Sequence, residues 1–325
     1  MRLLSAASLF FVTYVSSICA QAQVQVLTSI KPLQLIAAAV QDELGKPEVL
    51  LPPGASPHHY ALRPSDVVRV READLLYWIG PDMEGFLPRV LEGRSKSDVA
   101  VQTLSGLTLR HFGEESDGHD HDHDHDHDHD HDHEGHDQDE SAADEHDHDH
   151  RPGSLDAHLW LHPANARIIA DRMAADLAKA DPKNAARYQA NATAFGQRLA
   201  ALDQRIKAQV QGVAGKPYFV FHEAYDYFES AYGLKHTGVF SVLAEVQPGA
   251  RHVAAMRERL QKTGPACIFS EPPLRPRLAQ TLSAGLPVKL AELDALGGDL
   301  PVNSNGYEAL LENLATGLTE CLGSL

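Results

Sequence analysis

Cysteine, positive charge and long apolar runs are all scarce in this sequence, and each scarcity excludes a class of protein. There are three cysteines in 325 residues, and none has the C-x-x-C spacing of a redox motif or a zinc knuckle. The formal net charge is −17, so nothing indicates the basic face that nucleic-acid binding requires. The length excludes a peptide hormone or a disulfide mini-protein, and a hydrophobic content of 43% excludes wholesale disorder. A chain of this size forms one large domain or two of ordinary size.

The negative charge and most of the histidine are confined to one segment, residues 114–150. It holds 18 Asp and Glu and no Lys or Arg, which leaves 27 acidic and 28 basic residues in the rest of the chain. A near-neutral globular body therefore carries one acidic insert. The insert also contains 12 of the 20 histidines, most of them alternating with aspartate: His119, His121, His123, His125, His127, His129, His131, His133, His136, His146, His148 and His150.

This insert is too polar to fold by itself. It buries too little apolar surface to offset its chain entropy, so we expect a disordered surface loop. Alternating imidazole and carboxylate groups are ligands that divalent transition metals accept. Because each ion would have to gather several side chains from a flexible chain, we expect several weak metal sites rather than a tight one. A solvated acidic loop without any metal role is the alternative.

The first 22 residues have the features of a secretory signal peptide. Arg2 precedes an apolar, uncharged run over residues 3–18, and an A-x-A cleavage site occupies 20–22. The run is short of the ~20 apolar residues that span a bilayer, so we expect cleavage; an uncleaved anchor is the alternative. Cys19 does not indicate a lipoprotein, because Ile18 stands where lipidation requires a small residue. No later run is long enough to cross a membrane, so the exported product is expected to be soluble.

Removal of the signal leaves two cysteines, Cys267 and Cys321, in an oxidising compartment. An even pair there predicts one disulfide, which would tie the C-terminal tail to the strand that precedes Ser270. On the chain-entropy account, a loop of this length contributes about 4 kcal/mol to stability. Two buried free thiols are the alternative.

Apolar, strand-like runs alternate with helical stretches and with turns rich in Pro and Gly. Such alternation is typical of βαβ units around a parallel sheet. The pattern occurs before residue 81 and returns after residue 216, which predicts two lobes of one α/β architecture. We expect strands over residues 24–30, 48–51, 73–79, 218–221 and 267–269, and helices that begin near residues 33, 63 and 224.

A long helix is predicted between the two lobes, over residues 182–211. Asp181 is an N-cap residue followed by proline at the first helical position. No proline interrupts the stretch, so the helix would run about 30 residues, or ~45 Å. It could pack on both lobes as a stiff link, although an ordinary helix within one domain fits the periodicity equally well. Six apolar residues form its stripe: Tyr188, Phe195, Leu199, Leu202, Ile206 and Val210.

Eight histidines lie outside the insert: His58, His59, His111, His158, His162, His222, His236 and His252. Three of them fall at the ends of predicted elements, since His58 follows a turn, His158 precedes an apolar run and His222 closes a strand. Open α/β sheets bind ligands at the carboxyl ends of their strands, so these three could converge on one cleft. Three neutral imidazoles with an open fourth position suit tetrahedral Zn²⁺. Each one, taken alone, is more often a structural residue than a ligand, so the case depends on their positions and number.

Several short motifs, in a fixed order, make the chain similar to a known family. They are GASPHHY at 54–60, LRPSD at 62–66, HLWL at 158–161, FVFHEAY at 219–225, EVQPG at 245–249, FSEP at 269–272 and LD at 293–294. With the acidic insert between them, they resemble the cluster A-I (cluster 9) metal-binding proteins of ABC transporters over nearly the whole mature chain, most closely the periplasmic zinc-binding members. The resemblance implies an α/β fold of two (β/α) lobes with parallel sheets, joined by a long rigid linking helix, with the metal in the cleft between the lobes.

The resemblance also implies particular residues and boundaries. The metal ligands would be His58 and His158 from the first lobe and His222 from the second, and Cys267 would pair with Cys321. The implied division is a signal peptide at 1–22, an N-terminal lobe at 23–181 that contains the insert at 114–150, a linking helix at 182–211 and a C-terminal lobe at 212–325.

The implied ligand set bears on the choice of metal. Manganese-selective relatives carry a carboxylate at the position of His222, so an imidazole there favours zinc. Some zinc-binding relatives have Glu where this chain has Pro57, which removes one possible fourth ligand. The fourth ligand is expected to be water or Asp294, which matches a carboxylate ligand of the manganese relatives. His59 is a weaker candidate, because the side chains of adjacent residues point apart.

On this resemblance the chain is the periplasmic zinc-binding subunit of an ABC transporter. It would capture Zn²⁺ as its transported substrate and deliver the ion to a membrane permease with a cytoplasmic ATPase, as a monomer without enzymatic activity and without nucleic acid. A zinc-dependent hydrolase and a metal buffer or adhesin without a transport role are the alternatives. A hydrolase would need a general base beside a metal-bound water; Glu223 follows His222, but there is no H-E-x-x-H motif.

Overall fold

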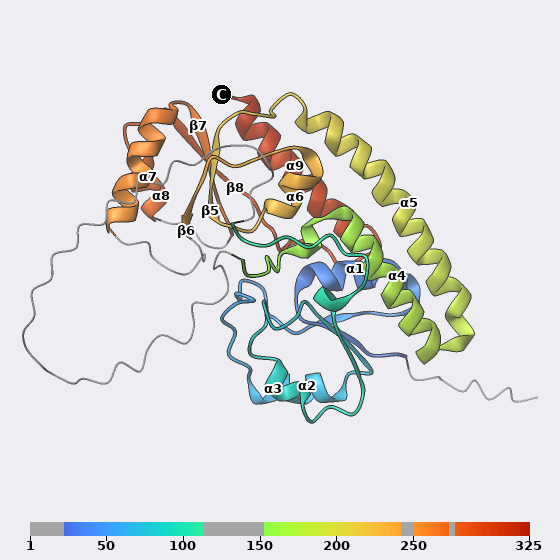
Figure 1. The fold of residues 1–325 in the computed structure, drawn as a ribbon. Coiled ribbons are helices and arrows are strands. Elements are labelled where there is room, and N and C mark those ends of the chain that lie inside the picture. Colours follow the sequence, from blue (N-terminus) through green and yellow to red (C-terminus); the bar gives the residue numbers. More distant parts are fainter. Residues whose placement is uncertain (1–22, 114–152, 242–249, 273–276) are drawn as a thin grey trace, which may run out of the picture.

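The computed structural model describes residues 23–113, 153–241, 250–272 and 277–325 (Figure 1). The signal segment and the acidic insert lie outside the described residues, so the expectations about cleavage and about the insert stay predictions. The EVQPG motif at 245–249 also lies outside them. No helix in the described ranges is long and apolar enough to cross a membrane.

The first lobe contains a parallel sheet of four strands in the order β2-β1-β3-β4. The strands are β1 (Val26–Thr28), β2 (Glu48–Val49), β3 (Leu75–Trp78) and β4 (Ser97–Ala100). Helix α1 (Lys31–Gln41) lies on one side of this sheet, and α2 (Pro64–Glu72) and α3 (Pro88–Leu91) lie on the other (Figure 1). Strands β1 and β3 are buried along their whole length, as apolar strands covered on both faces must be.

The second lobe repeats this topology. Its strands are β5 (Tyr218–His222), β6 (Gly238–Ser241), β7 (Ala266–Ser270) and β8 (Val288–Glu292), all parallel and in the order β6-β5-β7-β8. Its helices are α6 (Asp226–Tyr232), α7 (Ala250–Thr263) and α8 (Arg277–Ser283). In both lobes the first strand of the lobe is central and the second is at the edge, so the prediction of two parallel α/β lobes of one architecture is confirmed. The predicted strands are right in position, and most bounds differ by one or two residues.

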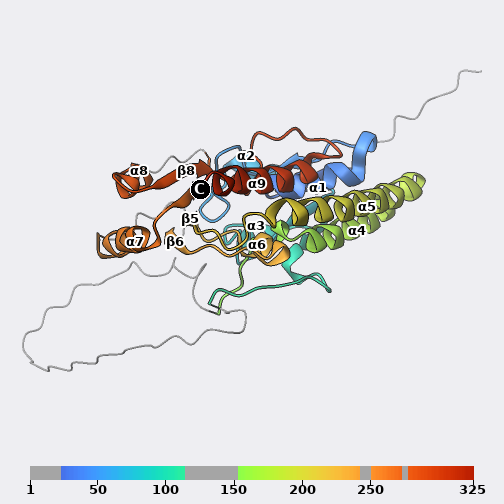
Figure 2. The ribbon, with the colours of Figure 1, turned by 90° about the horizontal axis from the view of Figure 1, so that it is seen from above.

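Three long helices connect and brace the lobes: α4 (Pro163–Ala180), α5 (Ala185–Val210) and α9 (Gly306–Gly323). Helices α4 and α5 run side by side in both views (Figures 1 and 2). Helix α5 contacts α1 of the first lobe and α6 and α9 of the second. All six residues of its predicted apolar stripe are buried. The helix therefore contacts both lobes, as a linking helix would, while its stiffness stays a prediction.

The start of this helix differs from the expectation. Residues Pro182–Asn184 form a 3₁₀ turn, and α5 itself has 26 residues, or ~39 Å. The carboxylate of Asp181 accepts hydrogen bonds from the side chains of Asn184, at 2.6 Å, and Tyr188, at 3.0 Å. Asp181 thus stands at the N-terminus of the 3₁₀ turn rather than directly before α5. Helices α4 and α9 were not predicted, although Ile169, Met173 and Leu177, all buried in α4, follow helical spacing.

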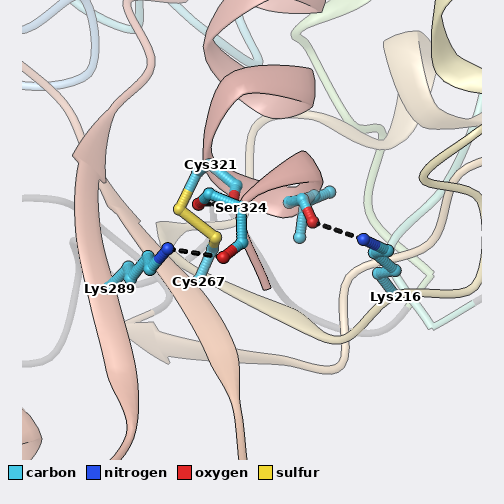
Figure 3. Close-up of a disulfide and its surroundings, with 6 residues drawn as sticks. Lys216, Cys267, Lys289, Cys321 and Ser324 are labelled. Atoms are coloured by element: carbon cyan, nitrogen blue, oxygen red, sulfur yellow. Dashed lines mark hydrogen bonds between the residues drawn. A yellow bond between two sulfur atoms is a disulfide. The ribbon is translucent and has the colours of Figure 1, made fainter.

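The predicted disulfide between Cys267 and Cys321 is present (Figure 3). It joins β7 to α9, with the two Cα atoms 6.2 Å apart. Near the same end of α9, Lys289 donates a hydrogen bond to the carbonyl of Ser324 and Lys216 donates one to the carbonyl of Leu322. Cations at a helix C-terminus satisfy its last carbonyls. The C-terminus of the chain is thus fixed to the second sheet by a covalent bond and by two charged side chains.

Candidate metal centre

Three histidines from distant parts of the sequence meet at one point between the lobes. The ring centroids of His58 and His158 are 5.4 Å apart, those of His58 and His222 are 5.4 Å apart, and those of His158 and His222 are 4.9 Å apart. One ring nitrogen from each lies within 4.8 Å of the other two. All three residues are buried, with exposed fractions of 9%, 2% and 4%. A cluster of neutral nitrogen donors this close together is a ready coordination sphere for a borderline divalent cation.

His58 is positioned by the loop between β2 and α2. Two prolines at 52 and 53 end the strand, and Gly54 adopts φ 76°, a left-handed conformation that glycine accepts without a Cβ penalty. The backbone N–H of His58 then donates to the hydroxyl of Ser56 at 3.3 Å. This turn directs the loop back over the carboxyl end of the first sheet, where ligands of parallel α/β sheets bind.

His158 is held by a buried carboxylate, that of Asp156. Its Oδ1 lies 2.7 Å from ring Nδ1 of His158 and also accepts the backbone N–H of His158 at 3.0 Å. A carboxylate on Nδ1 fixes a proton there and leaves the lone pair on Nε2 for a metal. The residue directly precedes the 3₁₀ turn Leu159–Leu161, where Trp160 donates its indole N–H to the carbonyl of Ala295. That bond connects the His158 segment to a loop of the second lobe.

His222 is the last residue of β5 and has a similar carboxylate partner. Its ring Nδ1 lies 3.1 Å from Oε1 of Glu271, which follows β7. The hydroxyl of Tyr225 lies 3.4 Å from the same oxygen and donates to the carbonyl of Leu293 at 2.8 Å. Adjacent parallel strands end at the same edge, so β5 and β7 deliver the imidazole and its carboxylate together.

The histidine cluster borders a cavity of about 380 Å³ between the lobes. One wall comes from the loop before α2 and the segment around His158, and the other from residues that follow β5, β7 and β8. The cavity is large enough for a hydrated ion, whereas the histidines at its base are nearly dry.

Neither Asp294 nor His59 joins the cluster. The carboxylate of Asp294 accepts three backbone N–H groups, from Leu296 at 2.9 Å, Gly297 at 2.8 Å and Gly298 at 2.8 Å. These bonds hold it in the turn after β8, although it lines the same cavity. His59 is exposed, and its ring centroid is 6.4 Å from that of His58.

Burial controls the charge of the Asp156 carboxyl. Desolvation raises its pKa well above the ordinary range, against the backbone hydrogen bond from His158, which lowers it. A divalent cation on His158 would add positive charge beside this group and favour its ionised form.

Sequence reasoning did not identify Asp156 or Glu271 as partners of the histidines. The signal for Asp156 was its position two residues before His158. A carboxylate at that spacing is close enough to contact the imidazole of His158. Glu271 had a weaker signal, a carboxylate immediately after the strand that pairs with the His222 strand. Pairing of β5 with β7 had to be known before the two could be connected.

Two parallel-sheet lobes with a histidine cluster in the cleft between them define a substrate-binding protein with a metal-binding cleft. The chain belongs to the ZnuA family, described as zinc-uptake complex component A periplasmic, whose sequence model matches residues 26–321. The high-affinity zinc uptake system protein ZnuA of Brucella abortus (strain 2308) is 38% identical over 323 residues, covering 97% of each chain. Proteins of this family are substrate-binding components of metal uptake and not enzymes.

Solved structures show the same fold. A crystal structure of ZnuA superimposes with a TM-score of 0.69 at 20% identity, covering 91% of this chain and all of that one. The substrate-binding protein FpvC of Pseudomonas aeruginosa, in complex with Mn²⁺, superimposes with a TM-score of 0.69 at 19% identity, covering 94% of this chain and all of that one. The expected fold class and family are therefore confirmed.

Proposed function

We propose that this chain binds Zn²⁺ as transported substrate through His58, His158 and His222, and delivers it in the periplasm to a membrane permease driven by a cytoplasmic ATPase. The observation that carries the proposal is the buried convergence of three ring nitrogens within 4.8 Å of one another. Zinc bound to imidazole has Zn–N distances of about 2.0–2.1 Å, so modest side-chain movement closes the three rings on one ion. The family description as a zinc-uptake component supports zinc as the substrate.

The donor set favours zinc over harder ions. Three imidazoles and no carboxylate form the cluster, and imidazole suits zinc, whereas carboxylate and water suit manganese and magnesium. With the Asp294 carboxylate held by three backbone N–H groups, we assign the fourth position to a water molecule in the cavity. The carboxylates of Asp156 and Glu271 act behind the ligands, by orienting the rings and raising their basicity.

Release of the ion is expected to begin in a loop rather than in a large lobe rotation. One continuous apolar core includes residues of both lobes, among them Leu35, Phe195 and Tyr307. Lobes that share a continuous apolar core resist hinge motion. The loop that carries His58, by contrast, has one ligand and is anchored by short turns. A permease that draws this loop away would leave the ion with two protein ligands and a lower affinity.

The test is zinc binding by calorimetry on wild type and on the His58→Ala, His158→Ala and His222→Ala variants. Wild type should bind one tight zinc, and each substitution should abolish that tight binding. His59→Ala is the matched control, because it removes a neighbouring imidazole that the structure leaves outside the cluster. Retention of tight zinc by the triple variant would contradict the assignment.

The acidic insert is proposed to hold additional zinc weakly and so to raise the local concentration of the ion. The composition supports this role, since 12 histidines alternate mostly with carboxylates over residues 114–150. Equilibrium dialysis should show several weak sites on wild type that disappear when these histidines are replaced by asparagine. If the number of weakly bound zinc ions stayed the same, the insert would instead be a solvated acidic loop without a metal role.

A further inference from the structure

A second group of metal-ligand side chains lies in the second lobe, away from the cleft. It consists of Asp226 and Glu229 on α6 and His236 just before β6, with one ligand atom from each lying within 4.8 Å of the other two. Asp226 and Glu229 are three residues apart on one helix and therefore share a face. The loop after α6 turns at Gly233, which ends the helix at φ 68°, and returns His236 to that face.

From this arrangement we infer an accessory binding site for a divalent transition-metal cation, formed by Asp226, Glu229 and His236. The chemistry differs from that of the cleft, since two carboxylate oxygens and one imidazole nitrogen replace three imidazoles. Such mixed oxygen and nitrogen sets accept zinc and related first-row cations. The site is separate from the cleft, because the cavities beside the two clusters share no lining residue.

The spacing of the ligand atoms supports occupation by one ion. His236 Nδ1 lies 3.0 Å from Oε2 of Glu229. That separation is the length of a hydrogen bond, and it is a few tenths of an ångström shorter than the edge of a tetrahedron of ligands, about 3.3–3.4 Å for ligands 2.0–2.1 Å from a metal. Tyr218 donates its hydroxyl to the other oxygen, Oε1, at 2.6 Å. The imidazole Nδ1 also lies 3.1 Å from Oε1, so both oxygens of Glu229 face the imidazole and Oε1 additionally accepts the Tyr218 hydroxyl.

Asp226 supplies the second carboxylate; burial and the neighbouring Glu229 raise its pKa, whereas His236, Arg110 and Lys235 attract its charged form. A half-buried carboxylate beside a second and more deeply buried one repels it, and a divalent cation between them would favour both charges. Binding one ion would satisfy Asp226 and relieve the repulsion between the two carboxylates.

The surroundings favour a cation and give it access. A cavity of about 400 Å³ opens beside the cluster and is lined by four carboxylates, those of Asp156, Glu223, Asp226 and Glu229, against two permanent cations, Arg110 and Lys235. Gly113, the last described residue before the acidic insert, lies at its edge. The cavity therefore has an excess of negative charge at the point where the chain enters the insert.

The test is anomalous diffraction at the zinc absorption edge on crystals of the full chain soaked in zinc. We expect a peak about 2.0–2.3 Å from the three ligand atoms, in addition to a peak in the cleft. In D226N the accessory peak should disappear while the cleft peak stays, and in D171N, a matched change of an exposed carboxylate on α4, both peaks should stay. A cleft peak without an accessory peak in wild type overturns the inference, as does an accessory peak that D226N leaves unchanged.

A solution measurement separates this inference from the proposed function. In the His58/His158/His222→Ala triple variant, zinc should still slow the modification of His236 by diethyl pyrocarbonate, followed by peptide mass spectrometry. Adding D226N should abolish that protection. Protection in the triple variant supports the accessory site whatever the cleft binds, and absence of protection overturns it even if the cleft proves to be the transport site.

Discussion

Ring Nδ1 of His158 lies 2.7 Å from Oδ1 of Asp156, with both side chains at most 3% exposed. The Asp156 carboxylate thus orients His158, a ligand of the proposed zinc site, from inside the first lobe. The Glu271 carboxylate has the same relation to His222 at 3.1 Å, but its side chain is 19% exposed. The deeper pair should therefore contribute more to the affinity for the ion, because a charge interaction is stronger where water is excluded.

Replacement of Asp156 by alanine should weaken zinc binding by about 10–100-fold, the usual effect of removing a carboxylate behind a metal-bound histidine. Competition with a zinc chelator measures the affinity. D156N, which keeps an acceptor oxygen but not the charge, should fall between wild type and D156A. Equal zinc affinity in D156A and wild type would show that the carboxylate only stabilises the fold, and the thermal unfolding of the metal-free variants measures that separate effect.

Removal of the disulfide should destabilise the protein without affecting the metal site. The double change C267A/C321A should lower the free energy of unfolding by about 2–5 kcal/mol, measured by denaturant titration. Zinc affinity should stay the same, since neither cysteine lines the cleft cavity. Wild type under reducing conditions is the control, because it loses the same bond without any change of sequence. If the variant lost zinc binding under conditions in which it is still folded, the C-terminal helix would position the ligands directly.

Glu84 should make stability fall as the pH rises through the acidic range. Its side chain is completely buried, and burial raises the pKa of the carboxyl from an ordinary 4.5 to about 7, despite hydrogen bonds from the backbone N–H groups of Ile79 and Gly80. Between those two values the folded protein keeps a proton that the unfolded chain has lost. The Glu84 contribution to the free energy of unfolding should therefore decrease by ~3 kcal/mol between pH 4.5 and pH 7.

The variant E84Q lacks this titration and serves as the reference. The difference in free energy of unfolding between metal-free wild type and E84Q, measured by denaturant titration at several pH values, should change by about that amount in favour of E84Q as the pH rises. A difference that is constant with pH would show that Glu84 keeps an ordinary pKa.

Deletion of residues 114–150 should leave one tight zinc per molecule. The two ends of the insert are already joined, because the N–H of Phe112 donates to the carbonyl of Ser154 and the N–H of Gly153 donates to the carbonyl of Phe112. A short connection can therefore replace the insert without moving His158. Calorimetry should show unchanged tight binding and the loss of weak sites. If the tight site disappeared, the main site would lie in the insert rather than in the cleft.

Local sequence signals were sufficient for the elements with strong patterns. The apolar runs ending at Ile79 and His222 and the stripe from Tyr188 to Val210 had to be buried, because exposing so many apolar side chains costs more than ordering them. The histidines could be chosen as candidates because His58 follows a turn, His158 precedes an apolar run and His222 closes a predicted strand. The start of α5 could not be placed, because no proline or glycine separates the 3₁₀ turn Pro182–Asn184 from the α-helix that follows it.

The sequence by itself determined that two α/β lobes form, that Cys267 and Cys321 are available to pair, and that nitrogen donors outnumber carboxylates among the candidate ligands. Only the tertiary structure decided which carboxylates stand behind those donors, that Asp294 is occupied by its own turn, and that Asp226, Glu229 and His236 meet. The reason is physical: burial and periodicity are local properties of a chain, whereas the distance between side chains on different strands depends on how the sheets pair and how the lobes pack.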